Sequence, residues 1–205
     1  MAILVVKEEK TRMKMSAAVP SKSSGMYIAK RVVAWMKEVG CALGDMVMKS
    51  DQEAAIEAIV KNVGRIRAEQ GGGKYHVKAS PVASSRSNGS VERAILSVQQ
   101  MVRTLRSALM RRWGVKVPTK HPVMPWLIEY ASFLFNRLEV GKDGRTCYER
   151  SRGKAVKVLG FEFGEAVLWK RRKESDWGLG EARQHVGPWR VPGRQGQERG
   201  NHHRG

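Results

Sequence analysis

Two acidic residues lie at positions that suit metal-dependent chemistry. Asp51 follows residues 46–48, an apolar run that predicts a buried strand, and Glu92 lies in the first turn of a helix predicted from about residue 90 to 112. In an α/β sheet, chemistry collects at the carboxyl ends of strands, so acids distant in the chain can converge there. Paired carboxylates in a basic protein indicate divalent metal ions held against a phosphodiester.

Both acids also have a purely structural interpretation. Aspartate is favoured at a helix N-cap, and a helix is predicted directly after Asp51. Glu92 is favoured in a first turn by the helix dipole. Each of these interpretations is compatible with the metal-binding one, because a helix mouth exposes its acids to solvent.

Four polar residues near the two acids are candidates for contact with a nucleic-acid backbone. Lys49 precedes Asp51, Arg93 follows Glu92, and Arg86 lies in the serine-rich stretch before the helix. Asn88 and the glycine after it predict a turn that sets the entry angle of the helix and lies near DNA. The alternative is that these are ordinary solvated side chains.

The net charge of the chain limits the classes of partner that it is expected to bind. The 205 residues include 38 Lys and Arg against 19 Asp and Glu, a formal net charge of +19. Such an excess favours a polyanionic partner, foremost nucleic acid, over a small-molecule substrate. An anionic membrane is less favoured, because no lipidation motif or basic amphipathic anchor occurs. Two distant cysteines and the lack of a signal peptide predict a soluble intracellular protein, in the nucleus or the cytoplasm.

Hydrophobic periodicity predicts an α/β fold with a partly parallel sheet, because strands alternate with helices. Strands are expected at residues 2–6, 13–19, 46–48 and 75–79, and helices at 26–39, 52–70, 90–112 and 126–138. We divide the chain into a core over residues 1–150, a short β extension over 151–170, and a basic tail over 171–205. The tail is predicted to be disordered, because it has too few aliphatic residues to offset its ordering entropy.

Three segments resemble the integrase catalytic core of retroviruses and, more closely, that of copia-type retrotransposon polyproteins. They read MKSDQEAAI, SPVASSRSNGSVERAI and DGRTCYERSRGK. In that family an aspartate follows a hydrophobic strand, and a glutamate follows an Asn-Gly turn and precedes an arginine, as Asp51 and Glu92 do here. The family usually has Thr-Pro-Tyr-Glu further on, where this chain has Cys147 in place of the proline. The resemblance covers roughly residues 2–170.

The resemblance implies a ribonuclease-H-like fold, a mixed sheet flanked by helices, with Asp51 and Glu92 as catalytic and metal-binding residues. It implies Mg²⁺ or Mn²⁺ as cofactor, DNA as partner, and transfer of a DNA 3′ end into target DNA; it leaves a homo-oligomer open. The family's first catalytic aspartate lies on a strand just before the hairpin with which this chain begins. We therefore expect an N-terminally truncated core that lacks its central strand and is inactive alone. The alternative is a non-catalytic, basic nucleic-acid-binding protein with the same fold.

Overall fold

The computed structural model of the protein describes residues 2–19, 25–79, 85–156, 160 and 162–166, with residues 85–88 described as backbone only. The chain divides into two compact units, Met1–Leu159 and Gly160–Gly205. The regular elements described below all lie in the first unit. The predicted tail over 171–205 lies outside the described residues.

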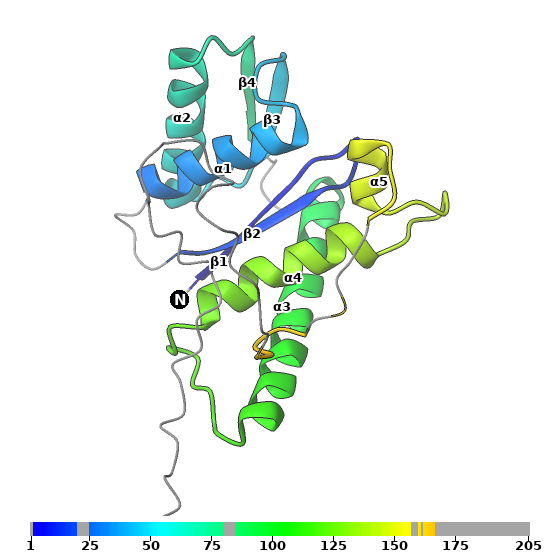
Figure 1. Ribbon diagram of the computed structural model, residues 1–205. Coiled ribbons are helices and arrows are strands. Elements are labelled where there is room, and N and C mark those ends of the chain that lie inside the picture. Colours follow the sequence, from blue (N-terminus) through cyan, green and yellow to red (C-terminus); the bar gives the residue numbers. More distant parts are fainter. Residues whose placement is uncertain (1, 20–24, 80–84, 157–159, 161, 167–205) are drawn as a thin grey trace, which may run out of the picture. The chain divides into compact units, whose positions relative to one another are not determined.

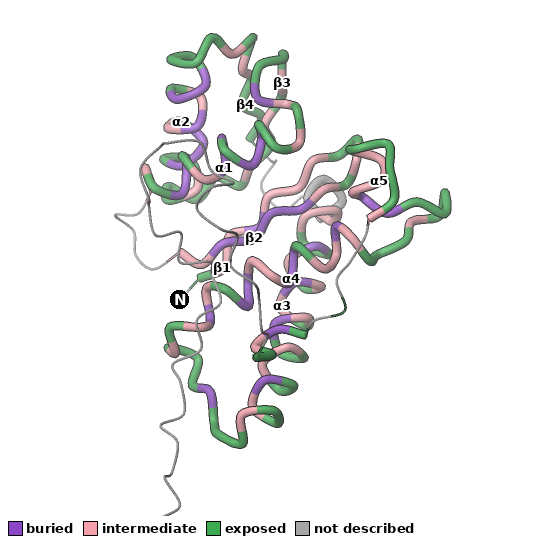
Figure 2. Tube along the Cα trace, viewed as in Figure 1, coloured by how far each residue is buried: buried purple, intermediate pink, exposed green. Residues whose placement is uncertain are grey.

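The N-terminal hairpin forms as its alternating pattern predicts. Strand β1 (Ala2–Lys7) pairs antiparallel with β2 (Lys14–Val19), in a register that sets Ala2 opposite Val19 and Lys7 opposite Lys14. The turn between the strands is closed by the Glu8 amide, which donates to the Met13 carbonyl at 2.8 Å. Most of β2 is buried, as Figure 2 shows, because helices pack against it.

A second pair of strands is parallel. Strand β3 (Met46–Ser50) pairs with β4 (Tyr75–Ala79), and helix α2 (Ala54–Glu69) makes the crossover between them (Figure 1). The predicted mixture of parallel and antiparallel pairing is therefore confirmed. The described strands form two two-stranded sheets, with no ladder between the pairs.

The main apolar core lies around α1 (Gly25–Val39). One face of this helix is buried, with Ile28, Val32 and Met36 among its fully enclosed side chains. This face packs against residues of α2 and β2 in one cluster, to which the partly buried methionines of β3 also contribute. Packing of this amphipathic face, rather than helix propensity, is the main stabilisation of such a helix.

Three further helices complete the first unit. Helix α3 (Ser85–Trp113) packs on β1 and on α4 (Met124–Leu138), and α4 covers β2. The short helix α5 (Cys147–Arg152) follows a loop and has a capping box, in which the Thr146 hydroxyl accepts from the Glu149 amide and Glu149 accepts from the Thr146 amide. The capping box satisfies amides that would otherwise lack partners at the helix start.

Some sequence predictions are wrong in detail. Helix α3 begins at Ser85, so the backbone of Asn88 and Gly89 is helical where a turn was predicted. Once the apolar stripe of α3 is packed, extending the helix through a glycine costs only about 1 kcal/mol. Helix α5 includes the first two residues of the segment 151–170, and residues 157–159, 161 and 167–170 of this segment lie outside the described residues, so the β extension stays a prediction.

Candidate nucleic-acid interface

Asp51 lies directly after β3, where the strand pattern predicts it, and its side chain is exposed. The N-cap position of α2 is occupied by Glu53, which makes no side-chain capping hydrogen bond. The interpretation of Asp51 as the N-cap residue is therefore wrong. The exposed side chain at a strand end keeps Asp51 as a candidate ligand.

Glu92 lies on α3 and is also exposed. Because the helix begins at Ser85, Glu92 falls in its second turn, and the first turn contains no acidic residue. The dipole effect declines within the first turn, so the interpretation of Glu92 as a first-turn acid is wrong as well. Because the Glu92 side chain is exposed, the packing of α3 does not explain why an acid occupies this position.

The donor chemistry of Asp51 and Glu92 suits Mg²⁺, which prefers carboxylate oxygens. Among the residues that the structure describes, however, no three His, Cys, Asp or Glu side chains are grouped so that they could hold a metal ion. The described residues do not fit a complete metal site, and we derive no reaction step through a metal.

The predicted backbone-contacting residues are distributed over two elements. Lys49 is exposed on β3, and Arg86 and Asn88 lie in the first turns of α3, where the backbone alone is described. Arg93 is exposed on α3 and lines a pocket with five other basic residues. Lys49 does not line this pocket.

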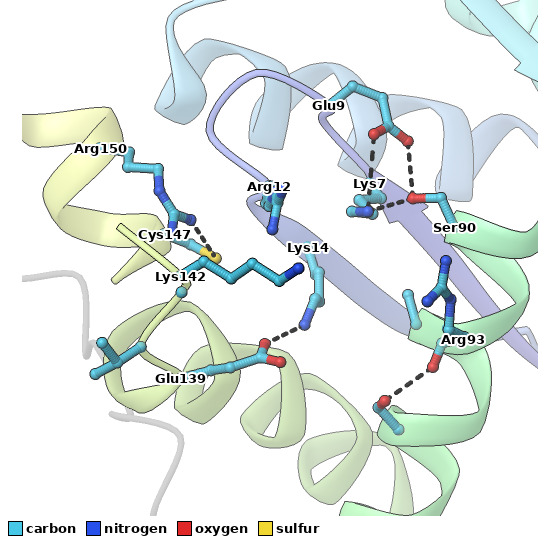
Figure 3. A pocket seen from close by; sticks show the side chains of 14 residues that line it. Lys7, Glu9, Arg12, Lys14, Ser90, Arg93, Glu139, Lys142, Cys147 and Arg150 are labelled. Carbon is cyan, nitrogen blue, oxygen red and sulfur yellow. Dashed lines mark hydrogen bonds and ion pairs between the residues drawn. The ribbon is translucent and has the colours of Figure 1, made fainter. Parts of the chain in front are cut away.

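The pocket has a volume of about 480 Å³ and lies in the first unit, between the hairpin turn, residues 90–97 of α3, and the loop that leads into α5 (Figure 3). Its lining includes six cationic side chains and two carboxylates: Lys7, Arg12, Lys14, Arg93, Lys142 and Arg150, with Glu9 and Glu139. We call these six cations the basic pocket. Five of them were not predicted from the sequence.

Three of the six cations are held in place by acids. Lys14, whose side chain is only 8% exposed, pairs with Glu139, and Lys7 lies 3.7 Å from Glu9. Lys7 also donates to the Ser90 hydroxyl of α3, which donates in turn to Glu9 at 3.1 Å. The Lys7–Ser90 bond ties the end of β1 to the first turns of α3.

Arg150 is the third paired cation, and it binds Asp143 through two nitrogens. Its Nε lies 2.8 Å from Asp143 Oδ2, and a second nitrogen contacts Oδ1. This hydrogen bond lowers the pKa of Asp143 well below its usual range, and it raises the pKa of Arg150. Burial raises the pKa of the neighbouring Cys147 thiol, so the thiol stays neutral and adds no negative charge to the pocket.

The other three cations have no carboxylate partner among the described residues. These are Arg12, Arg93 and Lys142, which come from the hairpin turn, α3 and the loop before α5. Arg93 donates through Nε to the Gly89 carbonyl at 3.1 Å. Figure 3 shows Arg12, Lys14 and Lys142 extending into the same space. The arrangement can bind an anion through several charge-assisted hydrogen bonds.

None of the helices among the described residues is both long and apolar enough to span a membrane.

No protein-family model and no curated protein sequence matches the chain. Among solved structures, it is similar to the catalytic core domain of BIV integrase, with 15% sequence identity and a TM-score of 0.50. The likeness covers 73% of this chain and 84% of that one. The chain therefore has a mixed α/β fold like that of an integrase catalytic core.

Proposed function

We propose that the chain is an integrase-type core that binds DNA. The observation that carries the proposal is the likeness of its fold to the BIV integrase core, in a chain where Asp51 follows a strand and Glu92 lies exposed on a long helix. The net charge of +19 supports a polyanionic partner, because basic side chains gain affinity by releasing counterions from phosphates. The three motif segments support descent from a copia-type retrotransposon integrase.

Asp51 and Glu92 are the proposed metal ligands of this core, with Mg²⁺ or Mn²⁺ as the ion. A bound ion of this kind supplies charge stabilisation in phosphoryl transfer. The proposed reaction of the ancestral enzyme is transfer of a DNA 3′ end into target DNA. Because the described residues contain no group of three or more His, Cys, Asp or Glu side chains that could hold a metal ion, we expect this chain alone to carry out no strand transfer.

The test of the metal site uses Mn²⁺ binding followed by electron paramagnetic resonance, with a DNA duplex present. Asp51→Asn and Glu92→Gln should each weaken Mn²⁺ binding. Glu57→Gln, which removes an exposed acid from α2, is the matched control and should bind like the unmodified chain. If the unmodified chain and all three variants bound Mn²⁺ with equal affinity, Asp51 and Glu92 would not be metal ligands.

The second candidate function is nucleic-acid binding without catalysis. It is favoured by the basic pocket and by the lack of a three-acid group among the described residues. A strand-transfer assay with Mn²⁺ separates the two candidates. Activity that Glu92→Gln abolishes would establish an enzyme and contradict the inactivity that we expect. Tight DNA binding that neither Asp51→Asn nor Glu92→Gln alters, without any activity, favours the binding protein.

A further inference from the structure

The basic pocket is a separate feature from Asp51 and Glu92, neither of which lines it. We propose that it binds phosphate groups of a nucleic-acid backbone, with Arg12, Arg93 and Lys142 as the contacting cations. The choice of nucleic acid as the source of the phosphates rests on the proposed function. The site itself rests on the geometry and charge of the pocket.

Charge balance is the first argument. Glu9, Glu139 and Asp143 each compensate one cation, and this leaves Arg12, Arg93 and Lys142 uncompensated within the described part of the chain. Like charges gathered around one cavity repel, the more so where protein replaces water on several sides. A bound anion would relieve this repulsion. Since the Cys147 thiol is neutral, it adds no negative charge that would offset these three cations.

The hairpin turn supports Arg12 in a defined position, which is the second argument. The Glu8 carboxylate accepts from the Lys10 amide at 2.8 Å and from the Thr11 amide at 2.6 Å. Arg12 itself has a φ of 64°, the left-handed conformation, which is uncommon for a residue other than glycine. A turn fixed in this way presents Arg12 with little backbone entropy left to lose on binding.

The loop that carries Lys142 is also fixed. The Gly141 amide donates to the Arg145 carbonyl at 2.9 Å, and the Gly144 amide donates to the Gly141 carbonyl at 3.0 Å. A β-carbon at position 141 would overlap the Arg150 guanidinium, so a larger residue there would push the end of the Arg150 side chain from its place against this loop. Arg150 therefore holds the loop through Asp143 and leaves Lys142 to extend into the pocket.

The chemistry of these groups favours phosphate. Guanidinium groups match the oxygens of phosphate in pairs, and a lysine adds a mobile point charge. A cavity of about 480 Å³ is larger than a single phosphate needs and opens to solvent beside exposed Arg12 and Lys142, as a site for a continuous backbone must.

The test compares two double variants of the full chain, each losing one arginine and one lysine. Arg12→Gln with Lys142→Gln alters the pocket, and Arg111→Gln with Lys116→Gln removes exposed charges at the far end of α3 and beyond it. Binding of a labelled DNA duplex is followed by fluorescence anisotropy over a range of salt concentrations. Binding of pyrophosphate, a small probe of the pocket, is measured by calorimetry.

We expect the pocket variant to lower the salt dependence of duplex binding by about two contacts and to weaken pyrophosphate binding about tenfold or more. The Arg111→Gln, Lys116→Gln variant should have smaller effects on both the salt dependence of duplex binding and the affinity for pyrophosphate. Duplex binding that both double variants weaken equally would overturn the pocket site while leaving the proposed function intact. If the unmodified chain did not bind the duplex at all, the proposed function would be overturned. If pyrophosphate still bound in that case, the assignment to nucleic acid would be overturned.

Discussion

Asn136 of α4 connects the helix to the outer edge of β2. Its Oδ1 accepts from the Lys14 amide at 2.8 Å, and its Nδ2 donates to the Lys14 carbonyl at 2.7 Å. Both residues are buried. One side chain thus satisfies two backbone groups at an edge that has no neighbouring strand among the described residues, and it fixes the backbone of Lys14, one of the cations of the basic pocket.

Replacing Asn136 by leucine keeps the branched shape and the number of heavy atoms of the side chain and removes both hydrogen bonds. A buried backbone group left without a partner costs about 1–3 kcal/mol, so two of them cost about 4 kcal/mol. The added apolar surface of leucine offsets about 1–2 kcal/mol of this loss. We therefore expect Asn136→Leu to lower the free energy of unfolding by about 2–3 kcal/mol, a large fraction of the 5–15 kcal/mol typical of a domain.

Urea denaturation followed by circular dichroism measures this change. Leu138→Ala serves as a control in the same helix, because Leu138 is 54% exposed and its truncation should cost less than about 0.5 kcal/mol. The reasoning is refuted if Asn136→Leu costs no more than Leu138→Ala. Such a result would mean that water or a neighbouring group satisfies the Lys14 backbone as well as Asn136 does.

Three further perturbations test the fold around the pocket. Thr146→Ala should cost about 1 kcal/mol by urea denaturation, because it removes the cap of α5, and Thr146→Ser should restore most of that loss. Leu127→Ala should cost about 2–5 kcal/mol, because Leu127 is fully buried, whereas Leu43→Ala should leave stability nearly unchanged at a site that is 62% exposed. Partial burial would raise the pKa of Glu8, but hydrogen bonds from the turn lower it overall, so Glu8 stabilises the fold above its unfolded pKa of about 4.3. The stability difference between the unmodified chain and Glu8→Gln should therefore be largest near pH 7 and shrink as the pH falls below about 4; a difference that grows with acid would contradict it.

The order of strands and helices was predictable because the apolar residues repeat with the period of each element. The hairpin, α1, α2 and both strands of the parallel pair lie within a few residues of the predicted bounds. The start of α3 was not predictable in this way. Its first residues are polar and include Asn88 and Gly89, which locally favour a turn, and the helix extends through them from a stripe packed further along.

The start of helix α5 has a signal in the sequence that an analysis of hydrophobic periodicity does not detect. Thr146 and Glu149 are spaced as a capping box requires, so the segment TCYE, which the family resemblance singled out, also has a local structural role. The candidate acids Asp51 and Glu92 could be proposed from motifs. The basic pocket could not, since Lys7, Arg93 and Arg150 meet only when the hairpin, α3 and α5 have packed together. The register alone, with Lys7 opposite Lys14, would have indicated a need for nearby acids.

The separation of the strands into two pairs has a consequence for how the first unit unfolds. No described backbone ladder crosses from the hairpin to the parallel pair, and the apolar cluster around α1 joins the two through side chains. Trimming methyl groups from this cluster, as in Val32→Ala, would weaken the link without touching either pair of strands. We therefore expect the cooperativity of the first unit to depend on one helix face, and we expect the calorimetric transition of such a variant to be broader than that of the unmodified chain.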